Sequence, residues 1–178
     1  MGSGSVFERQ SALGNVAGES RGWALVQAAA FNSTHAEFRQ AMRRPLGGDL
    51  PPTIGEVFHV NGRQLLKTGA EQYWIITRDS DDIIPGLQRA IPAQMGAITS
   101  LSHSRTCIFI EGPHAAAVLA KGVPLDFHPE VFRVDHFALT GIHHTPVLIH
   151  RTAEDRYDIY ALRTYAMTVW EWLTDAVK

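Results

Sequence analysis

TSLSHSRTCIFIEGPHAAAVLAKGVPLD, residues 99–126, is the stretch of this chain that says most about its fold. Residues 106–110 alternate between two sets of side chains, as a strand with two different faces requires. Gly112-Pro113 then predicts a helix start, because proline at the first helical position needs no N–H bond. Gly122 predicts the helix end, since glycine tolerates the left-handed conformation that closes many helices. We therefore expect two strands that lead into a capped helix.

A similar order of elements occurs earlier in the chain. His35 leads through a predicted helix to Pro45, and His114 leads through another to Pro124 with the same spacing. Each half also has an aromatic strand before its last helix, which indicates an internal duplication. Chance similarity between short apolar strings is the alternative explanation. The expected organisation is an α+β protein with a flexible N-terminal arm at residues 1–20 and two fused β-α-β-β-β-α-type subdomains at residues 21–93 and 94–178.

Local signals place most elements of the first subdomain. Asn61-Gly62 lies between two apolar runs and predicts a hairpin, because both residues accept the positive φ angles of a tight turn. Thr34 and Glu37 have the spacing of a capping box, which predicts a helix start. The other expected elements are strands at residues 23–31 and 71–77 and a helix that follows acidic caps at residues 79–82, holds Pro85 in its first turn and ends at Pro92.

The second subdomain is expected to begin with a strand near residues 97–101 and to end with an aromatic helix. One apolar stripe of that helix should face the core. Tyr165 and Trp172 lie about 120° around the helix from this stripe. A neighbouring loop or a subunit contact could cover them, and we prefer the contact because aromatic residues are enriched at interfaces. The stripe consists of Ala166, Val169, Trp170, Leu173 and Val177. The remaining expected strands are residues 133–140, 145–151 and 156–161.

Composition restricts the classes of function. The chain has 178 residues with 45% hydrophobic and 19% charged side chains, which is enough for a substantial core. A net charge of −2 gives no reason to expect binding to nucleic acid or to an anionic membrane. No apolar run is long enough to cross a bilayer, and the N-terminus lacks the features of a secretory signal. We therefore expect a cytoplasmic protein in which the single Cys107 is a buried apolar residue.

Nine histidines suggest a metal site, but their spacing argues against one. The chain has no HExxH and no paired CxxC motif, and His143-His144 falls in a predicted turn where neighbouring side chains diverge. Solvated or hydrogen-bonded histidines are the preferred interpretation. A GxSxG elbow and a phosphate-binding loop with Lys-Ser/Thr are also absent from the sequence. We assign no catalytic, cofactor-binding or metal-binding residue.

Residues 102–129, SHSRTCIFIEGPHAAAVLAKGVPLDFHP, resemble the gamma subunit of heterotetrameric sarcosine oxidases. In that family a His-x-Arg-Thr strand leads into Gly-Pro, an Ala-rich helix and Lys-Gly-x-Pro-Leu-Asp. Residues 157–160, YDIY, together with Arg163 and the final helix TYAMTVWEWLTDAVK, are similar to the end of the same subunit. The resemblance covers residues 71–178 well and the N-terminal part only loosely.

The resemblance implies a fold like the folate-binding part of glycine-cleavage aminomethyltransferases. It implies a noncatalytic subunit of a complex that demethylates sarcosine oxidatively to glycine, forms hydrogen peroxide and passes the one-carbon unit to tetrahydrofolate. FAD, FMN, NAD, zinc and tetrahydrofolate would then belong to partner subunits. The implied partners are the alpha, beta and delta subunits, chiefly the large alpha subunit. Candidate partner contacts are Tyr165, Trp172, His103 and Arg105.

Two other functions remain open at this stage. A gamma subunit of a related oxidoreductase for another N-methylated amine would have nearly the same sequence. A stand-alone folate-binding or one-carbon transfer protein is the alternative from a different class, with Tyr73 or Trp74 stacked on the pterin ring. Against it, no aminomethyltransferase catalytic carboxylate maps onto this chain. For His103 and Arg105, hydrogen bonding at the end of a strand is the alternative to subunit contact.

Overall fold

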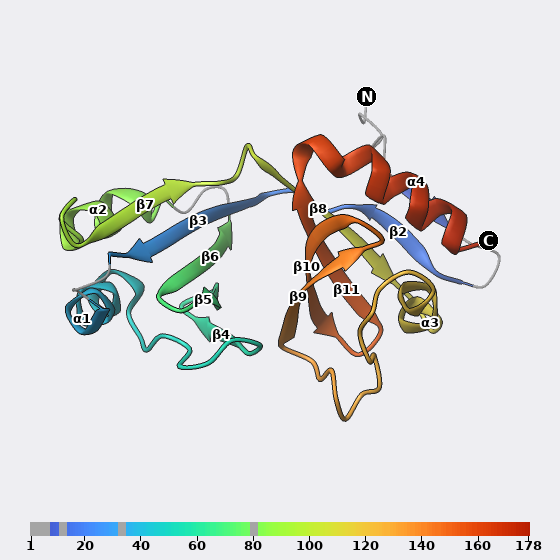
Figure 1. Ribbon diagram of the computed structural model, residues 1–178, viewed down its shortest axis with the longest axis horizontal. Helices are drawn as coiled ribbons and strands as arrows, with labels where there is room; N and C mark the ends of the chain where they lie inside the picture. Colours follow the sequence, from blue (N-terminus) through green and yellow to red (C-terminus); the bar gives the residue numbers. More distant parts are fainter. Residues whose placement is uncertain (1–7, 11–13, 32–34, 79–81) are drawn as a thin grey trace. The chain divides into compact units, whose positions relative to one another are not determined.

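Two antiparallel sheets carry the fold in the computed structural model, which describes residues 8–10, 14–31, 35–78 and 82–178 (Figure 1). They belong to two units. One unit consists of Gly22–His103, and the other joins the segment that ends at Arg21 to Ser104–Lys178. The fold is therefore α+β, as the sequence predicts.

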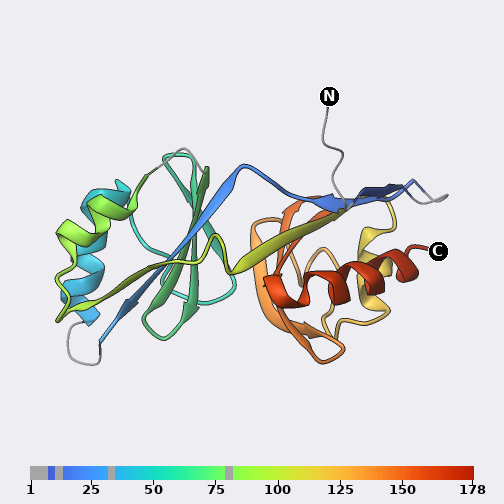
Figure 2. The same cartoon turned by 90° about the horizontal axis from the view of Figure 1, so that it is seen from above.

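The unit formed by Gly22–His103 contains a five-stranded sheet and two helices. Figure 2 shows both helices on one side of this sheet. The core between them includes Phe38, Met42 and Leu46, which recur every four residues and so share one face of their helix. The sheet order is β4 (Val57–Val60), β5 (Arg63–Gly69), β6 (Gln72–Arg78), β3 (Trp23–Ala30) and β7 (Gly96–Ser100), and the helices are α1 (His35–Leu46) and α2 (Ile84–Ala90).

The turns of this unit follow their local sequence. Asn61 and Gly62 have φ angles of 51° and 76° and join β4 to β5, so the predicted hairpin is confirmed. Gly47 ends α1 with a φ of 79°, and its N–H group donates to the Arg43 carbonyl at 2.8 Å. Pro85 lies in the first turn of α2, where its missing N–H group costs no helical bond.

The second unit contains a six-stranded sheet with helices packed against one face. Alternate residues of its central strands, such as Ile108, Ile110 and Ile159, enter a core with Val118 and Leu173 from the helices. The sheet order is β1 (Glu8–Gln10), β2 (Val16–Glu19), β8 (Arg105–Glu111), β11 (Arg156–Leu162), β10 (Thr145–Ala153) and β9 (His136–Ile142). The helical segments are α3 (Ala115–Ala120), the 3₁₀ turn η1 (Arg163–Tyr165) and α4 (Ala166–Ala176).

The two units have the same topology. Strand β3 is followed by α1, β4, β5, β6 and α2, and strand β8 is followed by α3, β9, β10, β11 and α4. Their sheets correspond strand for strand, as β4-β5-β6-β3 in one and β9-β10-β11-β8 in the other. The two predicted β-α-β-β-β-α units are therefore present.

An exchange of strands corrects the predicted assignment of residues 97–101. These residues form most of β7, which pairs with β3 of the first unit instead of opening the second. In the same way β2 precedes β3 in the chain but pairs with β8 of the second unit. The units consequently meet in sequence at His103 and Ser104 rather than near residue 93. A strand's partner depends on tertiary register, which short-range patterns do not contain.

The expected N-terminal arm also needs correction. Residues Val16–Glu19 form a sheet strand between β1 and β8, and the Asn15 side chain accepts a hydrogen bond from the His114 N–H group at 3.0 Å. Residues 1–7 and 11–13 of the arm lie outside the described residues. The same holds for Thr34 of the predicted capping box and for residues 79–81 of the predicted helix caps. The remaining predicted cap, Asp82, was wrong, because the N-cap of α2 is Ile83 and no side chain bonds to that helix start.

Two further boundaries differ from the predictions. Helix α3 begins at Ala115 instead of Pro113, because Gly112 has a φ of 135° and residues 112–114 form a turn. The predicted strand at residues 133–140 is β9, His136–Ile142, which follows a turn at Asp135 with a φ of 60°. Both shifts move an element toward the C-terminus past a residue with positive φ.

Candidate partner-contact surface

Helix α4 and the 3₁₀ turn η1 before it carry the two aromatic residues that the sequence singles out, Trp172 and Tyr165. Its buried face carries Ala166, Val169 and Leu173, with Trp170 packed against the same core and Val177 buried just beyond the helix end. The predicted stripe is therefore confirmed. Each large side chain of such a stripe contributes roughly 1.5–3 kcal/mol when fully buried.

Trp172 is covered from within its own unit. Its indole lies over Gly122, where an added Cβ would come within 2.6 Å of indole Cζ2. The edge of the ring also meets His143, with ring centroids 6.1 Å apart. Gly122 does not have the predicted left-handed conformation, because it is absent from the residues with positive φ. Glycine is needed here for space instead, and Trp172 packs on neighbouring loops.

Tyr165 remains at the surface, with 41% of the residue exposed. It ends η1, which is anchored to the start of β8 by two hydrogen bonds of Arg163. The Arg163 N–H group donates to the Ser104 carbonyl at 2.9 Å, and its guanidinium donates to the Arg105 carbonyl at 3.1 Å. Burial lowers the pKa of the Arg105 guanidinium. The structure thus brings Arg105 next to the segment that carries Tyr165.

His103 lies at the end of the other unit, in a pocket of about 460 Å³. Trp23, Asp82, Ser100 and Ser102 are among the other residues that line this pocket. The Ser102 hydroxyl bonds to the backbone of Leu25, accepting from its N–H group at 3.0 Å. His103 and Arg105 therefore belong to different units, although only one residue separates them in sequence.

A second group of exposed apolar side chains was not predicted from the sequence. Val131 and Val134 are 59% and 42% exposed in the 126–135 loop, which precedes edge strand β9, and Leu139 on that strand is 52% exposed. Phe132, between the two valines, is buried against Phe127 and Tyr157. The run 131–134, VFRV, could have indicated this group. Its aromatic residue Phe132 anchors the loop in the core, while Val131 and Val134 remain exposed.

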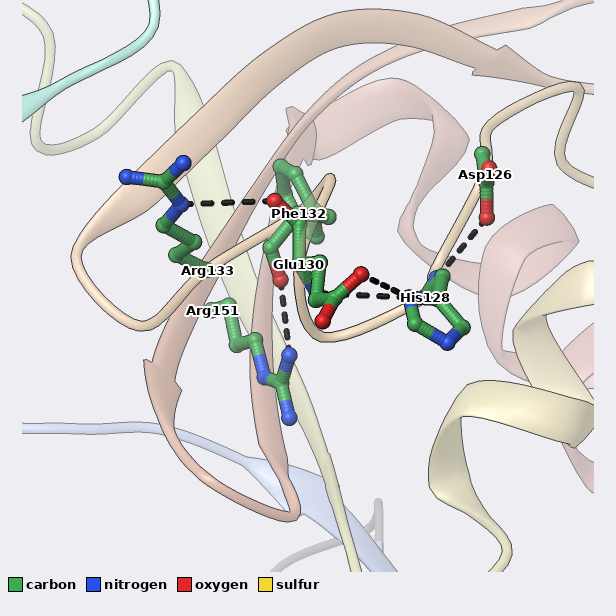
Figure 3. Close-up of polar contacts among 6 residues, drawn as sticks. All are labelled: Asp126, His128, Glu130, Phe132, Arg133 and Arg151. Carbon is green, nitrogen blue, oxygen red and sulfur yellow. Dashed lines mark hydrogen bonds and ion pairs between the residues drawn. The ribbon is translucent and has the colours of Figure 1, made fainter.

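Arg151 holds the 126–135 loop in a defined shape (Figure 3). Its buried guanidinium donates to the Phe132 carbonyl at 2.7 Å and to the Glu154 carbonyl at 3.1 and 2.6 Å. Within the loop, the His128 N–H group donates to Asp126 Oδ1 at 2.8 Å, and Arg133 Nε donates to the Glu130 carbonyl at 3.3 Å. Because the loop is bonded at both its base and its tip, it presents Val131 and Val134 in a fixed arrangement.

Comparison with known proteins assigns the family. The model of the sarcosine oxidase gamma subunit family matches residues 30–178 of this chain. The chain belongs to the sarcosine oxidase gamma subunit family. It is 32% identical over 139 residues to sarcosine oxidase subunit gamma of Corynebacterium sp. strain U-96, an alignment that covers 78% of this chain and 68% of the relative. It is 30% identical over 138 residues to the Arthrobacter sp. subunit, covering 77% and 68%.

Solved structures agree with this assignment to the gamma subunit family. A chain of the heterotetrameric sarcosine oxidase from Corynebacterium sp. U-96, solved with pyrrole 2-carboxylate, aligns with a TM-score of 0.86 and 27% identity. That alignment covers 96% of this chain and 87% of the other. Glycine cleavage system aminomethyltransferase T from Bartonella henselae aligns with a TM-score of 0.61 and 16% identity, over 87% of this chain and 44% of that one. The predicted aminomethyltransferase-like fold is thus confirmed.

The single cysteine of this chain lies in its interior. Cys107 is buried, and burial raises the pKa of its thiol well above the usual value. Such a thiol stays protonated and is a poor nucleophile.

Over the part of the chain that the structure describes, no three His, Cys, Asp or Glu side chains are grouped so that they could hold a metal ion. Among those same residues, no helix combines the length and apolar character that crossing a bilayer demands.

Proposed function

We propose that this chain is a noncatalytic subunit of a heterotetrameric sarcosine oxidase and that its role is to offer binding surface to partner chains. The observation that carries this proposal is the family match over residues 30–178, together with a fold that follows a chain of the solved heterotetramer over nearly its whole length. In this proposal the partners are alpha, beta and delta subunits, and the large alpha subunit is the main contact.

The chemistry of the proposed complex would take place outside this chain. Partner subunits would hold FAD, FMN, NAD, zinc and tetrahydrofolate, and the complex would convert sarcosine to glycine in the cytoplasm with formation of hydrogen peroxide. This chain would contribute buried interface area and correct placement of its partners. Its loss should therefore reduce assembly more directly than it reduces the chemical step.

The best candidates for direct contact are the exposed apolar residues on ordered backbone. Val131 and Val134 stand on the 126–135 loop that Arg151 fixes, and Tyr165 ends a turn that Arg163 anchors. A rigid apolar contact loses little conformational entropy on binding, which favours affinity. Trp172 would act indirectly through the packing of α4, and His103 and Arg105 remain proposed contacts beside these residues.

Co-expression tests the contact surface. We expect Val131→Asp and Val134→Asp to abolish co-purification of this chain with alpha, beta and delta subunits, because each places a charge in an apolar interface. Ile54→Asp is the matched control, since Ile54 is also apolar, has an exposure between those of the two valines, and lies in the other unit. Equal recovery of all three variants in the complex would remove the 126–135 loop from the proposed interface.

A further inference from the structure

A pocket of about 260 Å³ lies in the Gly22–His103 unit, and its walls carry three basic side chains. Arg39 and Arg43 are four residues apart on α1, so both reach the same side of that helix. Lys67 on β5 is the direct cross-strand partner of Tyr73 on β6, and both line the pocket. The apolar part of the lining consists of Leu50, Pro51 and Pro52.

The basic side chains differ in how firmly they are already engaged. Arg39 is paired with Glu71, whose side chain is only 11% exposed. Arg43 Nε lies 2.9 Å from Oδ1 of Asp49, but the Asp49 side chain is 73% exposed, and such surface pairs are weak. Lys67 Nζ donates to the Pro52 carbonyl at 2.9 Å, which neutralises no charge. Lys67 therefore keeps its charge for an incoming anion, and Arg43 can exchange its weakly held partner Asp49 for that anion.

Tyr73 also lines the pocket. Its ring is fully buried and stacks on Phe38 at a centroid distance of 6.4 Å. Its hydroxyl is buried beside the side chains of Arg39 and Glu71. Burial, and then the nearby Glu71 carboxylate, raise the pKa of Tyr73, so the hydroxyl keeps its proton at neutral pH. Tyr73 therefore contributes to the pocket lining as a neutral side chain.

We propose that this pocket binds a small organic monocarboxylate. Its carboxylate would lie between the Arg43 guanidinium and the Lys67 ammonium, and its apolar body would contact Leu50 and Pro51. Arg39, Arg43 and Lys67 against Glu71 and Asp49 leave one positive charge, which a monoanion balances. The apolar wall favours an organic carboxylate over inorganic phosphate. Charge-assisted bonds to Arg and Lys supply the attraction.

Titration of the purified full-length chain with benzoate, followed by amide chemical shifts in NMR spectra, tests the site. We expect saturable shifts near Leu50 and Tyr73, with acetate binding more weakly because it lacks the apolar body. Arg43→Gln and Lys67→Gln should each weaken benzoate about tenfold, the effect of one lost charge-assisted bond. Arg44→Gln is the control, since it removes the same charge from the same helix and does not line this pocket.

Two further variants separate binding from folding. Lys67→Arg keeps the charge and should retain benzoate binding, whereas a structural effect of Lys67→Gln would appear as a lowered melting temperature. Asp49→Asn should tighten benzoate several-fold, because it removes the carboxylate that competes for Arg43. Glu171→Gln in the other unit serves as its charge control. Unchanged affinity in Arg43→Gln and Lys67→Gln, or stronger binding of phosphate than of benzoate, would overturn the proposal.

Discussion

Replacement of Gly122 by alanine should destabilise the unit that contains α4. The new Cβ would lie 2.6 Å from Cζ2, 2.8 Å from Cε2 and 2.9 Å from Nε1 of Trp172, so the indole must move. His143 packs against the same ring, which limits where the ring can go. Overpacking of this kind costs about 1–3 kcal/mol. The lower entropy of the unfolded alanine chain offsets about 0.4–1 kcal/mol of this cost.

Urea unfolding followed by tryptophan fluorescence would measure this cost. We expect a net loss of about 1–2 kcal/mol in the free energy of unfolding, or roughly 2–8 °C in melting temperature. Gly86→Ala is the control, because that glycine lies in α2, its added Cβ meets only Pro45 Cβ at 3.6 Å, and alanine is the better helix former. It should be neutral or stabilising.

The double-mutant cycle identifies the cause of the Gly122 effect. In a Trp172→Leu background the cost of Gly122→Ala should largely vanish, since the overlap with the indole is gone. If the cost persisted in that background, a contact other than that with the indole would be its origin. If Gly122→Ala were as stable as the parent protein, the packing of Trp172 described above would be refuted.

Three other expected outcomes depend on buried polar groups. Cys107 should react with a thiol reagent such as dithionitrobenzoate only after denaturation, because burial raises the pKa of its thiol; rapid reaction of the folded chain would contradict this. Burial also raises the pKa of Asp158, so the folded state favours the protonated carboxyl. The resulting stabilisation of the fold is present below about pH 4 and is lost as the pH rises through the raised pKa of the folded state. Urea unfolding between pH 4 and 7 should therefore show the parent protein losing stability relative to Asp158→Asn. Finally, Arg151→Met should cost about 3 kcal/mol and speed trypsin cleavage after Arg133, which is already exposed, because the 126–135 loop loses its bond to the guanidinium; an unchanged digestion rate would argue against this role.

Local sequence signals predicted those parts of the fold that depend on local chemistry. The Asn61-Gly62 hairpin needs only two residues that accept positive φ, and the buried stripe of α4 needs only helical periodicity. The repeated order of elements was also visible, because each repeat carries its own turn and helix signals. The exchange of β2 and β7 was not predictable in this way. Each strand has the composition of any half-buried strand, and only tertiary register decides its partner.

The candidate contact residues show the same limit. The spacing on α4 correctly separated Tyr165 and Trp172 from the buried stripe, but it could not reveal that Gly122 and His143 cover Trp172. The exposed pair Val131 and Val134 was not predicted, because the expected strand at residues 133–140 included Val134 and separated it from Val131. A turn at Asp135 instead ends the loop before the strand begins.

Native mass spectrometry of the co-expressed subunits tests the central claim most directly. The account predicts a heterotetramer with one copy of this chain, and no sarcosine turnover or micromolar tetrahydrofolate binding by this chain on its own. A monomeric chain that stays apart from the alpha, beta and delta subunits and binds tetrahydrofolate at micromolar concentration would contradict it.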